Sequence, residues 1–153
     1  MTKTGTLLWL EQLFERDINR LIEEIGLYPD DGSLWKVLPG TTNTGGNLAL
    51  HLAGNIHLFI GKLIGKADYT RDRESEFSMN GLTKEQVVEK VVAAKEAALA
   101  GLISMPETDL EELYPIEVFK KPMKSGYFLI HLNGHLNYHL GQINYHRRVV
   151  SAM

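Results

Sequence analysis

The sequence predicts an all-α protein, a four-helix bundle with long connecting loops. Three observations predict this class: four segments carry helix signals, two of the connections between them are long, and 153 residues suit one compact domain better than two. We therefore expect one bundle domain over residues 1–153, in which side chains from facing helices can form a site.

The first predicted helix covers residues 7–28. Asp17 and Glu24 flank its apolar stripe and are candidate bases, but we favour a solvent-facing position for both, because the edge of a stripe usually faces water. The stripe itself consists of apolar side chains that recur in steps of three and four: Leu7, Leu10, Phe14, Ile18, Leu21 and Ile25.

Capping residues mark the starts of the second and third helices. Asn43 or Thr44 caps the second helix, which runs through NLALHLAGNIHLFIGKLIG and is apolar nearly all round, so it should be central in the bundle. Thr83 and Gln86 form a capping box before the third helix, and the Ala-rich run AAKEAALA supports its continuation to about Leu102.

The last helix follows a loop that contains prolines. Ser125 is expected to cap it, and the helix continues from about Gly126 to the C-terminus. The connecting loops exceed the roughly two to eight residues usual in bundles, so we expect them to cover one end as a lid or wall. One loop carries a dense charged run that forms a salt-bridged loop or closes the site: Arg71, Asp72, Arg73, Glu74 and Glu76.

Composition excludes several function classes. The chain has 16 Lys and Arg, 19 Asp and Glu and no Cys, which excludes disulfides, iron–sulfur clusters, Cys-ligated zinc and a thiol nucleophile. No apolar run reaches the roughly 18 residues of a membrane span, and the basic residues form no dense stripe for nucleic acid. We expect a soluble, cytoplasmic protein without membrane or nucleic-acid partners. No acid follows Glu117, so Arg147 and Arg148 could meet an anionic ligand, or complement the end of the last helix.

The histidines are unevenly placed, and four of the six lie in the last helix. On a helical wheel, His131, His135, His139 and His146 share one arc with Gln142, next to the leucines and away from the asparagines, which indicates that they look into the bundle. Two histidines at i and i+4 can reach one metal ion, and a third ligand must come from another helix. The spacing leaves the pair open between His131/His135 and His135/His139.

The natural third ligand is His51, in the second helix. Asn55 lies four residues further on the same face and could hold a metal-bound water or orient a ligand, whereas His57 points elsewhere. On the last helix, Gly134 and Gly141 form a small patch that a neighbouring helix or a second subunit could approach closely.

Three segments resemble the DinB-like superfamily of four-helix bundles: GNLALHLAGNIHLFIG, RDRESEF and YFLIHLNGHLNYHLGQINYHRR. That family includes bacillithiol and mycothiol S-transferases and a mycothiol-dependent maleylpyruvate isomerase. The resemblance implies a divalent metal, zinc or nickel, held by His51, His135 and His139, with His131 and His146 as pocket or supporting residues. The sequence departs from many members at Tyr138, where they have a histidine.

The resemblance also implies a function. A metal ion held by three neutral ligands activates a bound thiol or water, so a low-molecular-weight thiol would attack a small electrophile in stress or detoxification chemistry. Asn55, His131 and Gln142 are the residues expected to orient either partner, and a homodimer is expected. The alternatives are a metal-binding stress protein without turnover and a metal-dependent hydrolase.

Overall fold

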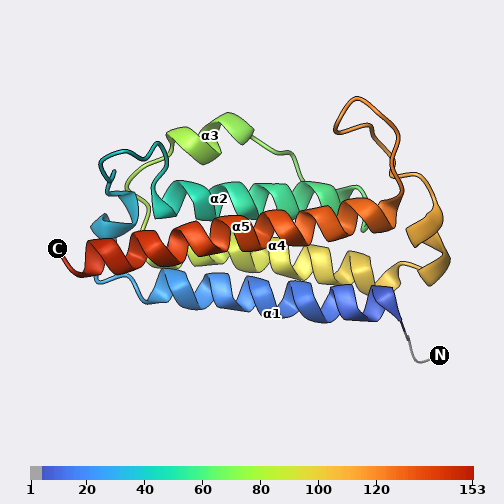
Figure 1. Cartoon of the computed structure of the whole chain (residues 1–153), viewed down its shortest axis with the longest axis horizontal. Coiled ribbons are helices and arrows are strands. Elements are labelled where there is room, and N and C mark those ends of the chain that lie inside the picture. Colours follow the sequence, from blue (N-terminus) through green and yellow to red (C-terminus); the bar gives the residue numbers. More distant parts are fainter. Residues whose placement is uncertain (1–4) are drawn as a thin grey trace.

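The structure is a computed structural model that describes residues 5–153. The described chain contains five α-helices, two short 3₁₀-helices and one π-helix, joined by loops (Figure 1). Their bounds are α1 Thr6–Gly26, η1 Gly32–Trp35, α2 Gly45–Ile56, η2 His57–Lys62, α3 Arg73–Ser78, α4 Lys84–Ser104, η3 Glu107–Glu111 and α5 Ser125–Ser151. None of the helices in this range is both long and apolar enough to cross a membrane.

The predicted four-helix bundle is confirmed. It consists of α1, α2 with its continuation η2, α4 and α5, and α5 packs against both α1 and α2. In Figure 1, α1 and α5 run in one direction and α2 and α4 in the other. Because α5 lies between α1 and α2, it faces a different neighbour on each of its two flanks.

The apolar faces of α1 and α2 are buried as the sequence predicts. All six stripe positions of α1 are buried, and so are all 12 residues of α2, which confirms α2 as the central helix. Burial of apolar surface of this kind contributes about 25 cal/mol for each Å² removed from water, which makes these faces the main source of stability.

The helix starts confirm two of the predicted caps and correct the third. The Thr44 hydroxyl accepts from the Asn47 backbone N–H, and Thr83 and Gln86 form the complete capping box. Ser125 is not a cap: α5 already begins at this residue, no side chain caps it, and the Ser125 N–H donates to the backbone of Glu112 at 2.9 Å. The chain before α5 supplies the partner that a capping side chain would otherwise provide.

The predicted second helix changes its winding at His57. The N–H of Leu63 donates to the carbonyl of Leu58, five residues earlier, so the segment is a π-helix and not an α-helix. Here the backbone passes close to α4, because a Cβ added to Gly65 would lie 2.9 Å from the Cα of Gly101.

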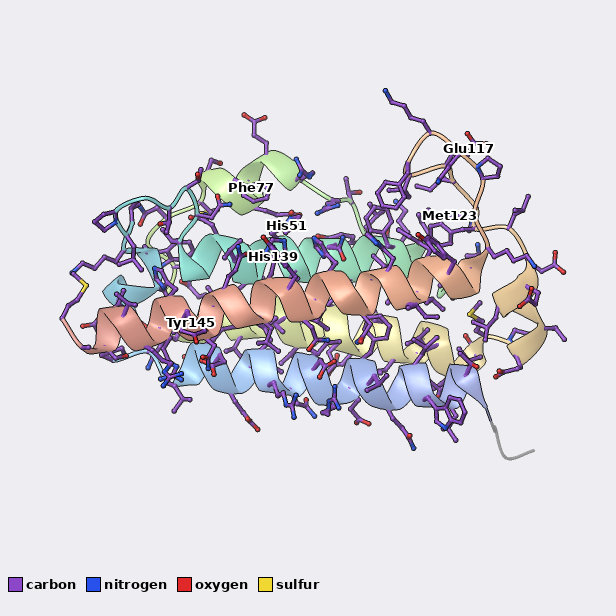
Figure 2. The ribbon with its side chains drawn as sticks, in the orientation of Figure 1. His51, Phe77, Glu117, Met123, His139 and Tyr145 are labelled. Atoms are coloured by element: carbon purple, nitrogen blue, oxygen red, sulfur yellow. The ribbon has the colours of Figure 1, made fainter. Side chains whose placement is uncertain are left out.

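The loops lie differently from the prediction. Residues 66–81 include the short helix α3, whose first turn is capped by the Asp72 carboxylate through the N–H of Ser75 at 3.2 Å. This helix packs along the side of α2, and the Asn47 amide donates to the carbonyls of Glu76 and Met79. The other long loops lie at opposite ends of the bundle; Figure 2 shows Glu117 and Met123 at the end where α5 begins. A helix of six residues held by such contacts has no apolar period of its own to reveal it.

Candidate metal centre

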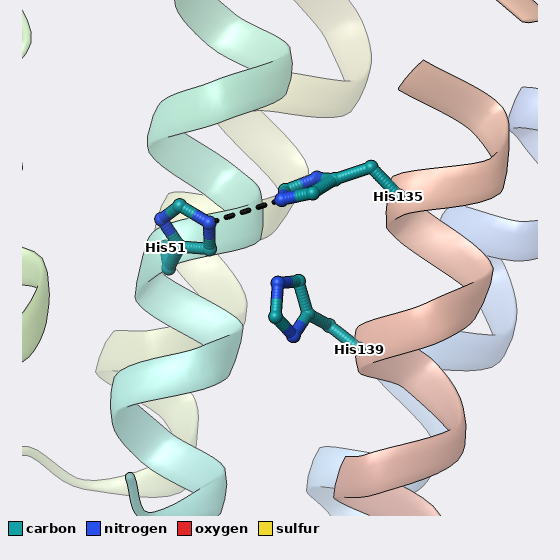
Figure 3. A group of neighbouring side chains, drawn as sticks. All are labelled: His51, His135 and His139. Carbon is teal, nitrogen blue, oxygen red and sulfur yellow. Dashed lines mark hydrogen bonds between the residues drawn. The ribbon is translucent and has the colours of Figure 1, made fainter. Parts of the chain in front are cut away.

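Three histidines from two helices meet between α2 and α5 (Figure 3). His51 comes from α2, and His135 and His139 are one turn apart on α5, as the wheel requires. One ring nitrogen of each lies within 4.8 Å of those of the other two, and the Nε2 atoms of His51 and His135 are 3.2 Å apart. His51 is buried, and the other two are partly buried.

The His51 ring is held from behind by a buried ion pair. Its Nδ1 lies 3.1 Å from Oε1 of Glu76, and the Arg71 guanidinium donates to both oxygens of that carboxylate at 2.8 and 2.9 Å. Burial alone would raise the pKa of Glu76, but the hydrogen bonds from His51 and Arg71 hold it below its ordinary value. An ionised carboxylate accepts a hydrogen bond from Nδ1–H, which leaves the Nε2 lone pair of His51 free for the centre.

This contact depends on a glycine. A Cβ added to Gly54 would lie 1.8 Å from Oε2 of Glu76, so any larger residue there would push the carboxylate away. On the outer side of the centre, Phe77 of α3 lies over the His51 ring, with the centroids 4.9 Å apart (Figure 2).

The other two histidines have weaker supports. Nδ1 of His139 lies 2.7 Å from Oε1 of Gln142, an amide oxygen that accepts a hydrogen bond from Nδ1–H and so turns Nε2 inward. Nδ1 of His135 is buried and makes no hydrogen bond within residues 5–153. Burial, together with the neighbouring histidines, lowers the pKa of His135 to about 4, and burial lowers that of His139 as well.

This donor set fits a divalent metal ion. His135 and His139 favour their neutral, metal-binding forms, and the partners of His51 and His139 fix the tautomer in which Nε2 is unprotonated. Three protein ligands from two facing helices also leave coordination positions for water or substrate.

A cleft of about 330 Å³ is lined by two of the three histidines and lies between α2, α5 and the loops. His135 and His51 lie at one side of it, next to Asn55, whose side-chain Oδ1 is buried and makes no hydrogen bond to any described residue. The remaining lining is mostly aromatic and apolar, with two arginines: Phe59, Arg71, Arg73, Val118, Phe119, Phe128, His131 and Leu132.

Comparison with known protein families shows to which family the chain belongs. The model of the DinB superfamily matches residues 13–143, which include all three histidines. The chain belongs to the DinB superfamily. None of the curated proteins matches it significantly.

A solved structure shows the same fold. The chain is similar to a DinB-like protein from Bacillus cereus ATCC 10987, with a TM-score of 0.74 and 19% sequence identity. The match covers 93% of this chain and 91% of that one, so the bundle and its connections correspond along nearly the whole length.

The structure places the predicted ligand-orienting residues in three ways. Asn55 and His131 line the cleft, and the His131 ring stacks on that of Phe128 with the planes 11° apart. Gln142 does not line the cleft, and its Oε1 contacts the His139 ring at 2.7 Å. Tyr138 is 66% exposed and touches the His139 ring from outside.

The acids of α1 lie elsewhere than predicted. The Asp17 side chain is fully buried and accepts from the amides of Asn133 and Asn137 at 3.1 and 2.8 Å. The interpretation that it faces water is therefore wrong, because the asparagines of α5 point at α1. Asp17 and Glu24 also lie on the far flank of α5 from the histidines, so neither is a base for this centre.

The remaining candidates belong to structural contacts. Nε of Arg147 lies 2.6 Å from Oε2 of Glu24, so this guanidinium already has a carboxylate partner within the protein. His146 lies between the Tyr28 hydroxyl and the carbonyl of Lys36, each 2.7 Å away, and ties the loop after η1 to α5. His57 stacks on Tyr69 and takes no part in the centre.

Sequence reasoning missed the specific function of Glu76, which it named only within the charged run. A buried glutamate behind a histidine of the candidate centre leaves no spacing signal, since 25 residues separate it from His51. The signal available was Asp72, a helix-capping residue followed by acids, which marks the start of α3.

Proposed function

We propose that this protein is a metal-dependent transferase that joins a small thiol to an electrophile, with zinc or nickel held by His51, His135 and His139. The observation that supports it best is the group of three imidazoles, two of which, those of His51 and His135, line a cleft of about 330 Å³. The chain has no cysteine, so any reactive sulfur must arrive with a second substrate.

The residues around the centre have separate tasks in this proposal. A bound divalent ion would supply a Lewis acid that favours the thiolate form of the thiol. Glu76 and Gln142 orient His51 and His139, while Asn55 and His131 contact the molecules in the cleft. In the reaction, the sulfur forms a bond to carbon, the leaving group departs with its electron pair, and the thiol proton passes to solvent.

Elemental analysis tests the centre. The metal-depleted protein, incubated with Zn²⁺ or Ni²⁺ and passed through a desalting column, should retain one ion per chain. His51→Ala and His139→Ala should retain none, and His57→Ala, a histidine at the end of the same helix but outside the centre, should retain one. Stoichiometric metal in both of the first two variants would contradict the ligand assignment.

Turnover is tested separately with monochlorobimane as electrophile and bacillithiol, mycothiol, glutathione or coenzyme A as thiol. Conjugation that needs both metal and His139 supports the transferase. Bound metal without conjugation to any of these thiols favours a metal-binding stress protein. Metal-dependent release of p-nitrophenol from p-nitrophenyl acetate without a thiol favours a hydrolase.

We also propose that two copies of the chain pair through the outer face of α5. No Asp, Glu, Lys or Arg occurs in residues 125–146, and Gly134 and Gly141 have open space where a Cβ would stand. Around them lies an exposed stripe, 58 to 68% accessible, of the kind that marks an interaction surface, and Figure 2 shows Tyr145 on it: Tyr127, Ile130, Tyr138 and Tyr145.

Light scattering during gel filtration tests this pairing. The wild-type protein should have twice the 17.2 kDa chain mass. Combined Tyr127→Arg and Tyr145→Arg substitutions should give the monomer, whereas Trp9→Arg, an equally exposed aromatic on α1, should not. A monomeric wild-type protein contradicts the proposal.

A further inference from the structure

Two buried polar atoms beside the metal centre lack partners, and they are chemically complementary. They are Oδ1 of Asn55 and Nδ1 of His135, the two such side-chain atoms in residues 5–153 that make no hydrogen bond. Asn55 is 7% exposed, and both residues line the same cleft. Buried polar groups almost always have a partner, and a ligand in the cleft that both residues line is the candidate for that partner.

The chemistry of the two atoms defines that partner. When Nε2 of His135 faces the centre, its proton resides on Nδ1, which becomes a donor. The amide oxygen of Asn55 is an acceptor. A hydroxyl group satisfies both, since it accepts from one and donates to the other.

The walls of the cleft define the body of the ligand. Phe119 and Phe128 meet edge to face at 6.2 Å, and the rings of Phe128 and His131 are nearly parallel. Phe59, which lies in η2, meets Phe128 edge to face, with the ring centroids 5.3 Å apart. Such a set of faces and edges favours a planar aromatic ring over a flexible polar chain.

One cation at the cleft has no carboxylate partner. Arg71 is engaged by Glu76, but no described acidic group lies within 4.0 Å of the Arg73 guanidinium, which lies 5.2 Å from the Phe77 ring centroid. Arg73 is exposed, so it stands at the outer part of the cleft, while Asn55 is at the inner part. An anionic group on the ligand would complement it.

We propose that this cleft binds an aromatic compound with a hydroxyl group at Asn55 and His135 and an anionic group at Arg73. It deepens the proposed function, on which it rests for the cleft's place as the site of the second substrate. The aromatic ring lies among Phe59, Phe119 and Phe128.

Ligand-detected NMR titrations with three probes test each contact, on both the metal-free and the zinc-loaded protein. 4-Hydroxybenzoate carries all three features, benzoate lacks the hydroxyl, and phenol lacks the charge. We expect 4-hydroxybenzoate to bind about three- to tenfold more tightly than either of the others to the zinc-loaded protein, the range that one hydrogen bond contributes.

Variants assign the contacts. Arg73→Gln should abolish the advantage of 4-hydroxybenzoate over phenol and leave phenol binding unchanged, whereas Arg148→Gln, outside the cleft, should change neither. Asn55→Ala should abolish the advantage over benzoate. Phe119→Ala, a partly exposed position, should weaken all three probes.

Two outcomes overturn the proposal. Equal affinities for the three probes would show that the cleft recognises neither the hydroxyl nor the anionic group. An unchanged preference for 4-hydroxybenzoate over phenol in Arg73→Gln would show that another group, for instance the zinc ion, binds the carboxylate. The ring and charge contacts do not involve the metal, so their measurement in metal-free protein stands even if the transferase activity is absent.

Discussion

The two flanks of α5 bury polar side chains in opposite ways. The flank toward α1 carries asparagines whose amides reach the carboxylates of Asp17 and Glu24, and Arg16 and Arg147 complete the pairs. The flank toward α2 carries the histidines, where one nitrogen of His135 and the Asn55 oxygen make no hydrogen bond to any described residue.

The difference separates a structural polar network from a candidate functional one. On the α1 flank, the carboxylate oxygens have donors, so the network fixes the position of α5 on α1. On the α2 flank, the partners of His51 and His139 turn the remaining lone pairs toward one point. A buried polar group without a hydrogen-bond partner lowers the stability of the fold unless a ligand supplies that partner.

The largest expected effect is the loss of metal-dependent stabilisation on the histidine flank. With free metal at 100 times its Kd, the wild-type protein should gain about 2.7 kcal/mol in its free energy of unfolding. His135→Ala should gain nothing, while Asn137→Ala, two residues away on the other flank, should gain as much as wild type. Urea denaturation with and without Zn²⁺ measures this, and equal gains in both variants would contradict the comparison.

A smaller effect is expected from breaking the α1 flank. Asp17→Ala leaves the amides of Asn133 and Asn137 without their buried acceptor, which should lower the free energy of unfolding by about 2 kcal/mol. Metal stoichiometry should stay at one per chain, because no ligand changes. A stable variant, or one that loses metal, would show that the two flanks are not independent.

Within the histidine flank, the supports should differ in strength. Glu76→Gln replaces a charged acceptor by a neutral one of the same shape, so metal affinity should fall about tenfold, and the visible spectrum of the Co²⁺-loaded protein should shift. Gln142→Ala removes an amide that was already neutral and should cost less. Competition with a chromophoric chelator measures both, and the reverse order would refute this ranking.

The smallest expected effect is a difference between the two flanks in how the free energy of unfolding depends on pH. The pKa of His135 is lowered from its ordinary 6.5 to about 4 by burial, so the unfolded chain binds a proton there that the folded chain does not. The metal-free protein should therefore lose stability as the pH falls from about 6.5 toward 4, by about 1 kcal/mol at this partly exposed site.

The acids of the flank toward α1 stabilise the fold in their charged forms, in contrast to His135, which does so in its neutral form. Burial would raise the pKa values of Asp17 and Glu24, but hydrogen bonds from Arg16 and Arg147 and from the asparagines lower them. Their contribution is present above the unfolded pKa and is lost as the pH falls below about 4. Urea titrations between pH 7.5 and 4.5 should show a shallower slope for His135→Gln than for wild type, and identical slopes would contradict the assignment.

The sequence alone predicts the bundle and a pair of histidines on the last helix because both depend on local period. A stripe repeats every three or four residues, and the His135 and His139 pair is one turn of helix, so the wheel places them without knowledge of the neighbours. The resemblance to the family favours this pair over His131 and His135, and the structure brings His135 and His139 to His51.

What the sequence does not predict are contacts between elements that have no period in common. Asp17 looks like the edge of a stripe until the asparagines of α5 are placed against it, and Glu76 looks like part of a solvated run until α3 is laid on α2. In both cases a buried partner, more than 20 residues away, decides whether a charge faces water or protein.

Gly54 offers a way to sort relatives of this protein. The residue contributes no chemical group, yet any side chain at its position would occupy the space of the Glu76 carboxylate. A relative with a larger residue there cannot place a glutamate behind the equivalent of His51 in this way. The amino acid at this one position therefore separates relatives that can share the carboxylate-supported histidine from those whose centre must be tuned by other means.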